Sequence, residues 1–174
     1  MNDSWIGSIS LDIDVKYHHN NINHIIKNPK GDWYDLYAVK VILKNKKEII
    51  ELDKKDYIPR NYDYGLISLG VSMKLPEGYE ALVTPRSSTY KEYSFIQTNS
   101  VGVIDNSYNG TDDIWYFPFA CHNNNYDNKA LQFNDAICQF KLIENMPKIN
   151  FNIKEELNSV NRNGFGSTGR QGKN

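Results

Sequence analysis

Residues 85–90, PRSSTY, combine side chains that suit the binding of an anion. Arg86 carries a planar guanidinium that can hold two phosphate oxygens at once, and the hydroxyls of Ser87 and Ser88 follow it directly. Backbone N–H groups of the same turn would complete an anion cradle. The alternative is an ordinary surface turn, which is the more frequent setting of an isolated Arg-Ser-Ser sequence.

Residues 99–110, NSVGVIDNSYNG, place a carboxylate directly after an apolar run. Asp105 follows Val103 and Ile104, so it either caps a turn or is held there to orient a water and take its proton. Tyr108 either packs in the core or forms the wall of a pocket for a planar ligand.

Two further polar residues lie within otherwise apolar segments. Asp35 belongs to GDWYDLYA, residues 31–38, and needs a partner that could be an Arg, a backbone N–H or a metal-bound water. Gln139 belongs to FNDAICQFKLI, residues 133–143, and could serve a neighbouring loop or a ligand.

The segment NRNGFGSTG, residues 161–169, contains three glycines, two hydroxyl side chains, Arg162 and Phe165. Polar, Gly-rich chain ends are typical of disordered tails. The same composition also suits a flexible arm that acts on a ligand, so composition alone does not decide between the two.

Charge and motifs exclude several classes of protein. The chain has 20 Lys+Arg against 21 Asp+Glu, which favours neither nucleic acid nor a membrane surface. It has no phosphate-binding P-loop and no apolar run long enough for a transmembrane helix. His18, His19 and His24 lack the companions of a zinc site. The N-terminus lacks a secretory signal and the two cysteines suit reduced thiols, so we expect a cytoplasmic protein.

These side chains must be positioned by short strands. Residues 9–17 alternate apolar and polar side chains, which predicts a half-buried strand, and residues 39–43 and 48–52 predict a hairpin. Further strands are predicted at residues 66–73, 79–83, 94–98, 114–120 and 136–143. The pattern favours an all-β sandwich, barrel or jelly roll. We expect one domain over residues 1–159 and a C-terminal arm over residues 160–174.

Taken in order, GDWYDLYA, PRSSTY, GVIDNSYNG, NDAICQF and NRNGFGSTG resemble the five motifs of the homotrimeric dUTPase (dUTP diphosphatase) family. The resemblance covers about residues 31–169 and is strongest to the shorter Gram-positive bacterial and phage members. It implies a jelly-roll-like β-barrel that forms a homotrimer. Each active site would be built from neighbouring subunits, and the swapped C-terminal arm of one chain would close over a site formed by the others.

The implied reaction converts dUTP and water to dUMP and pyrophosphate, with Mg²⁺ bridging the phosphates. Asp105 would hold the attacking water, and Asp35 would reach the metal through a water. Arg86, Ser87, Ser88 and Gln139 would grip the phosphates. Uracil would enter a slot between Asn99 and Tyr108 that includes Gly102 and Ile104, with Tyr108 flat on the deoxyribose. From the arm, the implied substrate-binding residues are Arg162, Phe165, Gly166, Ser167 and Thr168, with Phe165 as a lid over the uracil.

The sequence departs from the family pattern at two places. Ala136 stands where the fourth motif usually has Arg, and Lys129 or Arg170 could replace that cation. In the fifth motif Arg162 is followed by Asn163 rather than Gly.

Two alternative functions belong to the same family. A dCTP deaminase, or a bifunctional deaminase–dUTPase, would need a proton-shuttling Glu where the GVID segment offers Asp105. A regulatory role, with a host or repressor protein as partner, would draw on residues 112–129, which are rich in aromatic residues and Asn.

Overall fold

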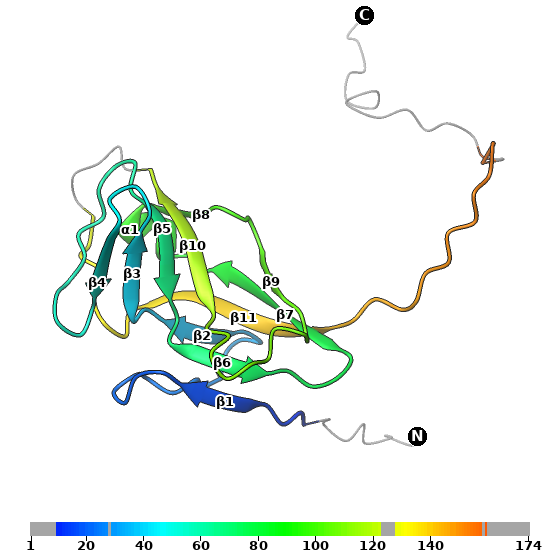
Figure 1. Ribbon diagram of the computed structural model, residues 1–174, viewed down its shortest axis with the longest axis horizontal. Coiled ribbons are helices and arrows are strands. Elements are labelled where there is room, and N and C mark those ends of the chain that lie inside the picture. The colour runs from blue at the N-terminus through cyan, green and yellow to red at the C-terminus, as the bar shows by residue number, and fades with distance from the viewer. Residues whose placement is uncertain (1–9, 28, 123–127, 158, 160–174) are drawn as a thin grey trace, which may run out of the picture.

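The computed structural model describes residues 10–27, 29–122, 128–157 and 159. Within these residues the regular secondary structure consists of strands and one short helix (Figure 1). The elements are β1 (Asp14–Tyr17), β2 (Tyr34–Tyr37), β3 (Lys40–Leu43), β4 (Glu48–Glu51), β5 (Tyr64–Ser68), β6 (Val71–Lys74), β7 (Tyr79–Pro85), α1 (Thr89–Tyr93), β8 (Phe95–Gln97), β9 (Gly102–Ile104), β10 (Tyr116–Cys121) and β11 (Ala136–Glu144).

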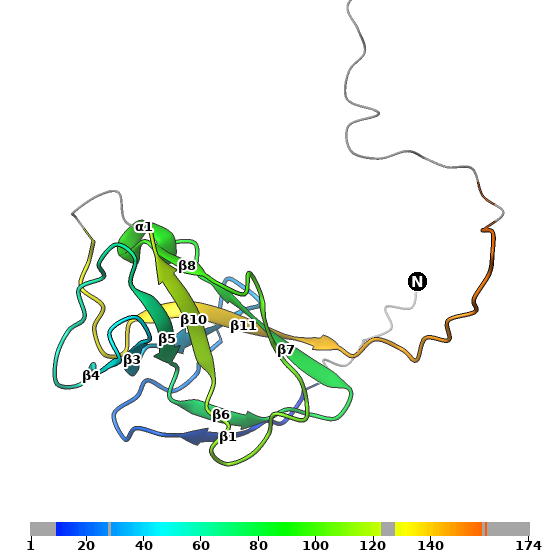
Figure 2. The ribbon, with the colours of Figure 1, turned by 45° about the horizontal axis from the view of Figure 1, so that its top comes forward.

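The strands form three antiparallel sheets that enclose one core (Figure 2). The largest sheet has the order β4-β3-β5-β10-β8, and β1 pairs only with β6. The remaining sheet has the order β2-β11-β7-β9 and connects most of the segments singled out in the sequence. The predicted 39–43 and 48–52 hairpin is present as β3 and β4.

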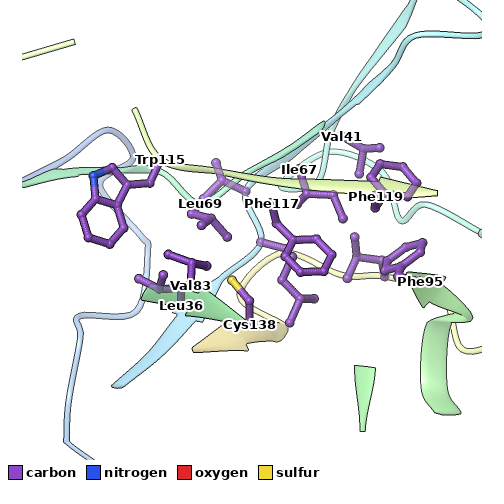
Figure 3. Close-up of a cluster of buried hydrophobic side chains, with 14 of the residues drawn as sticks. Leu36, Val41, Ile67, Leu69, Val83, Phe95, Trp115, Phe117, Phe119 and Cys138 are labelled. Atoms are coloured by element: carbon purple, nitrogen blue, oxygen red, sulfur yellow. The ribbon is translucent and has the colours of Figure 1, made fainter. Parts of the chain in front are cut away.

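Large apolar side chains from both major sheets meet in the core (Figure 3). Along β10 every second residue is buried, so Phe117 and Phe119 point inward beside Phe95 of β8. Leu36 and Cys138 enter from the opposite sheet. This period of two is what a strand with one buried face requires.

The predicted strand at residues 66–73 is wrong as a single element. β5 ends at Ser68, and β6 begins at Val71 in a different sheet. Gly70 lies between them with φ of +62°, a left-handed conformation that glycine adopts without steric cost. The continuous apolar run therefore conceals a sharp change of direction.

Two other expectations need correction. Of the described part of the predicted strand 9–17, Asp14–Tyr17 forms β1 and pairs with β6. Leu11 precedes this strand and is 40% exposed, and Val15 is 36% exposed because β1 has a neighbour on one side only. The sequence also gave no sign of α1, which follows PRSS directly.

After β11 the chain leaves the sheets, and residues 145–157 extend away from the barrel in both views (Figures 1 and 2). Large apolar side chains are exposed along this segment: Met146 76%, Ile149 50%, Phe151 88%, Ile153 97% and Leu157 77%.

Candidate active site

Three neighbouring strands bring Asp35, Gln139 and Arg86 together. In the strand register Gln139 of β11 faces Asp35 of β2 on one side and Thr84 of β7 on the other. Arg86 follows β7 immediately, and its Nε lies 3.1 Å from Oδ1 of Asp35. Gln139 Nε2 donates to the carbonyl oxygen of Pro85 at 3.4 Å. Of the partners that the sequence left open for Asp35, the structure shows the Arg.

The guanidinium of Arg86 is held but accessible. Its Nη1 donates to the carbonyl oxygen of Ala136 at 3.1 Å, and the side chain remains 35% exposed. The Asp35 side chain is 26% exposed, so both charges face solvent at this edge of the sheet. Such an exposed guanidinium can turn its remaining N–H groups toward an anion.

Thr89, which the sequence analysis missed, fastens the loop that carries Arg86. Its side chain is fully buried, its Oγ1 donates to the Ile137 carbonyl, and it accepts from the Arg86 backbone N–H at 3.1 Å. Ser88 is the N-cap residue of α1 without a side-chain cap bond, and Ser87 is exposed. The two serine hydroxyls therefore lie beside Arg86 without being used as helix caps.

The segment from β8 to β9 forms the second part of the site; β8 pairs with β10, whereas β9 pairs with β7 in the other large sheet. Gly102 lies opposite Val83 of β7, and a Cβ at Gly102 would come within 3.2 Å of the Val83 Cβ. Ile104 pairs with Ala81 and is half-buried, whereas Asn99 is exposed at the turn between the two strands.

Asp105 is an exposed carboxylate directly after β9. Its Oδ1 accepts from the hydroxyl of Ser107 and, at 2.8 Å, from the Ser107 backbone N–H. These hydrogen bonds, with that of the hydroxyl as the largest cause, hold the pKa of Asp105 below its ordinary value of 3.8. Asp105 thus caps a turn, as one sequence interpretation had it, and is also kept ionised, as a proton acceptor must be.

Tyr108 lies beside this turn rather than in the core. Its ring is 38% exposed, and its hydroxyl donates to the Ile114 carbonyl at 3.1 Å. Partial burial raises the pKa of its phenol, so it remains a neutral donor. An exposed ring fixed at its far end can serve as a flat wall for a ligand.

The two parts of the site are far apart within one chain. Ile104 pairs with Ala81, and Arg86 lies five positions further along β7, about 16 Å at roughly 3.3 Å per residue. Asp105 continues in the opposite direction. One chain therefore does not bring the Asp105 carboxylate to its own Arg86.

Asp35 suits a magnesium ion whose other ligands come mainly from substrate phosphates and water. Within the described ranges there is no group of three or more His, Cys, Asp or Glu that could bind a metal ion by itself. Asp35 pairs with Arg86 through Oδ1, and its side chain stays 26% exposed. Mg²⁺ commonly takes one or two carboxylates plus substrate phosphates and keeps several waters. Asp35 fits that requirement.

Lys129, one of the two cations suggested to replace the missing Arg, is already engaged. Its Nζ lies 3.7 Å from Asp135 Oδ1 and 3.6 Å from Glu92 Oε2, and it donates to the Tyr93 hydroxyl at 3.3 Å. Arg170 lies outside the described residues, as do Arg162, Phe165, Gly166, Ser167 and Thr168.

A second buried polar cluster was not foreseen and lies outside the candidate site. Asp63 is 1% exposed and accepts from Lys46 at 2.6 Å, Tyr57 at 2.8 Å and Asn45 at 3.2 Å. Burial alone would raise the pKa of Asp63, but these three donors outweigh it and hold the pKa below its ordinary value. The cluster is fully paired, which is typical of a structural role.

The fold and these side chains define a β-barrel protein with an accessible guanidinium beside β2, β7 and β11 and a separate exposed carboxylate after β9. The family model for dUTPase matches residues 34–169. The chain is 41% identical over 160 residues to the SPbeta prophage-derived deoxyuridine 5'-triphosphate nucleotidohydrolase of Bacillus subtilis, across 91% of this chain and 99% of that protein. It belongs to the dUTPase family.

Another relative is a phage protein. The deoxyuridine 5'-triphosphate nucleotidohydrolase of Escherichia phage T5 is 34% identical over 106 residues, across 60% of this chain and 68% of that protein. The resemblance to the Gram-positive and phage members is thereby confirmed.

Solved structures confirm the all-β, jelly-roll-like fold. A mutant dUTPase of Staphylococcus bacteriophage 80alpha with dUpNHpp has a TM-score of 0.67 at 18% identity, over 92% of this chain and 99% of that one. A mutant dUTPase of phage phi11 of S. aureus, described with a structural Mg(II) ion, has a TM-score of 0.61 at 16% identity, over 86% and 100%. Among the described residues of this chain, no helix is long and apolar enough to cross a membrane.

Proposed function

We propose that this protein hydrolyses dUTP to dUMP and pyrophosphate by attack of a water on the α-phosphorus. The observation that supports it best is the Asp105 carboxylate, which is exposed at the end of β9 and kept ionised by Ser107. Asp105 orients the water and takes its proton. The reaction would limit uracil in DNA and supply dUMP for thymidylate synthesis, and we place the protein in the cytoplasm.

The triphosphate binds at the edge formed by β2, β11 and β7. Arg86 contributes a guanidinium that is fixed by Asp35 and the Ala136 carbonyl, and Ser87, Ser88 and Gln139 add donors beside it. A bound Mg²⁺ ion would supply charge neutralisation across the phosphates. Asp35 would hold the hydration shell of that ion through its carboxylate.

Uracil and deoxyribose bind along the segment from β8 to β9. The close approach of Gly102 to Val83 leaves backbone groups rather than side chains to face the base, while Asn99 and Ile104 border it. Tyr108 supports the sugar with its exposed ring and leaves no room for a 2′-hydroxyl.

The complete site forms between subunits of a homotrimer. The register separates Asp105 from Arg86 of the same chain, so a phosphate next to Asp105 needs the Arg86 of a neighbour. The apolar side chains exposed along residues 145–157 support association as well, because water would otherwise solvate them. We propose that this segment packs on another copy and carries the arm, residues 160–174, over its site.

Replacement of Asp105 by Asn tests the assignment of the general base. The variant keeps the shape of the turn but cannot accept a proton, so turnover of dUTP should fall by about 10²–10⁴-fold while binding stays largely intact. Pyrophosphate release and titration with dUMP measure the two effects. Stepwise release of phosphate through dUDP by the wild type would contradict the mechanism.

Base and sugar selectivity test the substrate. Incubation with dUTP, dTTP, dCTP and UTP, with resolution of the products, should show dUMP formation and little action on the other three. Release of ammonia from dCTP would instead indicate a deaminase.

A further inference from the structure

The buried amide of Gln97, at the end of β8, fixes the orientation of the Asn99 amide in the turn that follows. Gln97 is 5% exposed, and its Nε2 donates to the Val83 carbonyl oxygen at 3.1 Å and to Oδ1 of Asn99 at 2.9 Å. Gly102 closes the space around it, since a Cβ there would lie 3.5 Å from Gln97 Nε2. The three groups Val83, Gln97 and Asn99 form a hydrogen-bonded chain.

The Val83 carbonyl oxygen determines which atoms donate and which accept in this series of hydrogen bonds. A backbone carbonyl oxygen only accepts, so the Gln97 atom beside Val83 has to be the amide nitrogen. The second hydrogen of that nitrogen then points at Asn99, which must present its oxygen. Nδ2 of Asn99 is thereby turned away from Gln97, and within the described part of the chain it has no partner.

Stability alone does not explain a Gln at this position. Gln97 Oε1 is buried and has no hydrogen-bond partner among the described residues. An unpaired buried oxygen destabilises the fold, and Leu would fill a similar volume without it. Phe95, two positions earlier on the same face, is an ordinary core residue. The amide is therefore retained for what its Nε2 does.

We propose that Gln97 is a positioning residue that makes the protein select uracil over cytosine by locking the Asn99 amide with its N–H₂ group toward the base. Uracil has a carbonyl oxygen at C4, which accepts from an N–H donor, whereas cytosine has an amino group there. A flipped Asn99 would present Oδ1 and favour cytosine. The inference rests on the proposed placement of the base beside Asn99.

Two substitutions at Gln97 distinguish the proposed orientation of Asn99 from a purely structural role. In Gln97→Glu the carboxylate only accepts, so Asn99 flips to donate to it, and the dCTP-to-dUTP ratio of kcat/KM should rise by about tenfold or more. In Gln97→Leu the orienting contact is removed without adding charge, so the ratio should rise less. The melting temperature should change little, because the unpaired Oε1 and the donor to the Val83 carbonyl oxygen are lost together. A structural role alone would lower stability and leave the ratio unchanged.

Gln132→Leu is the matched control, because it removes an exposed amide whose partner, Asp56, lies outside the segment from β8 to β9. It should leave the ratio unaltered. Equal loss of dUTP and dCTP turnover in both Gln97 variants, or an unchanged ratio in both, would overturn the inference.

Binding of dUMP and dCMP keeps this test separate from the proposed reaction. In one outcome the wild type releases no pyrophosphate and still binds dUMP more tightly than dCMP. If Gln97→Glu then weakens that preference, the role of Gln97 is supported and the proposed hydrolysis is contradicted. If the wild type hydrolyses dUTP but substitutions at Gln97 leave the preference for dUMP over dCMP unchanged, only the proposed role of Gln97 is contradicted. A wild type without preference for dUMP contradicts both.

Discussion

At the scale of single residues, Asp105 caps a turn, and we propose that it is also the general base; the sequence presented these two roles as alternatives. The hydrogen bonds from Ser107 cap a turn and at the same time stabilise the charged carboxylate. A catalytic carboxylate with a lowered pKa stays ionised at any pH that a cell provides. The turn therefore contributes to the chemistry as well as to the fold.

Replacing Ser107 by Ala should change the pH dependence of dUTP hydrolysis. A general base loses activity as the pH falls through its pKa, and the Ser107 hydroxyl keeps the pKa of Asp105 below 3.8. Without that hydroxyl the acidic limb of kcat/KM should move to higher pH, while activity near pH 8 changes by less than about tenfold. An acidic limb that stays in place would show that Asp105 does not govern it.

At the scale of elements, the turn at Gly70 separates β5 from β6 and allows the two strands to join different sheets. A Cβ at Gly70 would lie 2.6 Å from Val39 Cγ2 and 2.8 Å from Ile22 Cδ1. Both the backbone conformation and the packing therefore require glycine.

Gly70→Ala should destabilise the protein by the sum of two costs. The left-handed backbone costs about 1–2 kcal/mol, and overpacking against Val39 and Ile22 adds about 1–3 kcal/mol. Gly78→Ala is the control, because Gly78 has φ of +82° but open space around its Cα. Denaturant unfolding should show the larger loss for Gly70→Ala, and equal losses would contradict the packing argument.

The same scale shows what the sequence could and could not predict. Short apolar runs separated by turn signals located β3, β4 and β11, because these strands contribute side chains to the core. The break at Gly70 was hidden because the apolar run continues across it. Helix α1 has only five residues, too short for a period to be recognised. The pairing of Asp35 with Arg86 was one of several options, since only the strand register brings them together.

At the scale of the whole molecule, the Arg86 side chain and the Asp105 carboxylate lie apart within one chain, and residues 145–157 leave the barrel with apolar side chains exposed. Under the proposed function, other copies of the chain complete the active site. The division between a domain of residues 1–159 and an arm of residues 160–174 remains a prediction.

Cutting the chain after Ser159 tests the arm. The truncated protein should keep its fold and its trimeric state, because the barrel and residues 145–157 remain. Its kcat/KM for dUTP should fall by about 100-fold or more, since the donors of Arg162, Ser167 and Thr168 and the lid of Phe165 are lost. Analytical ultracentrifugation and pyrophosphate release measure the two properties, and full activity would make the segment a passive tail.

Subunit mixing tests the central claim, a dUTP-hydrolysing site shared between chains. Asp105→Asn and Arg86→Ala should each be inactive alone. Refolded together at equal amounts, they should recover roughly a quarter of the wild-type activity, because each site then needs one intact subunit type on each side. Activity that stays at zero in mixed trimers, while the wild type refolded in parallel is active, would contradict the account.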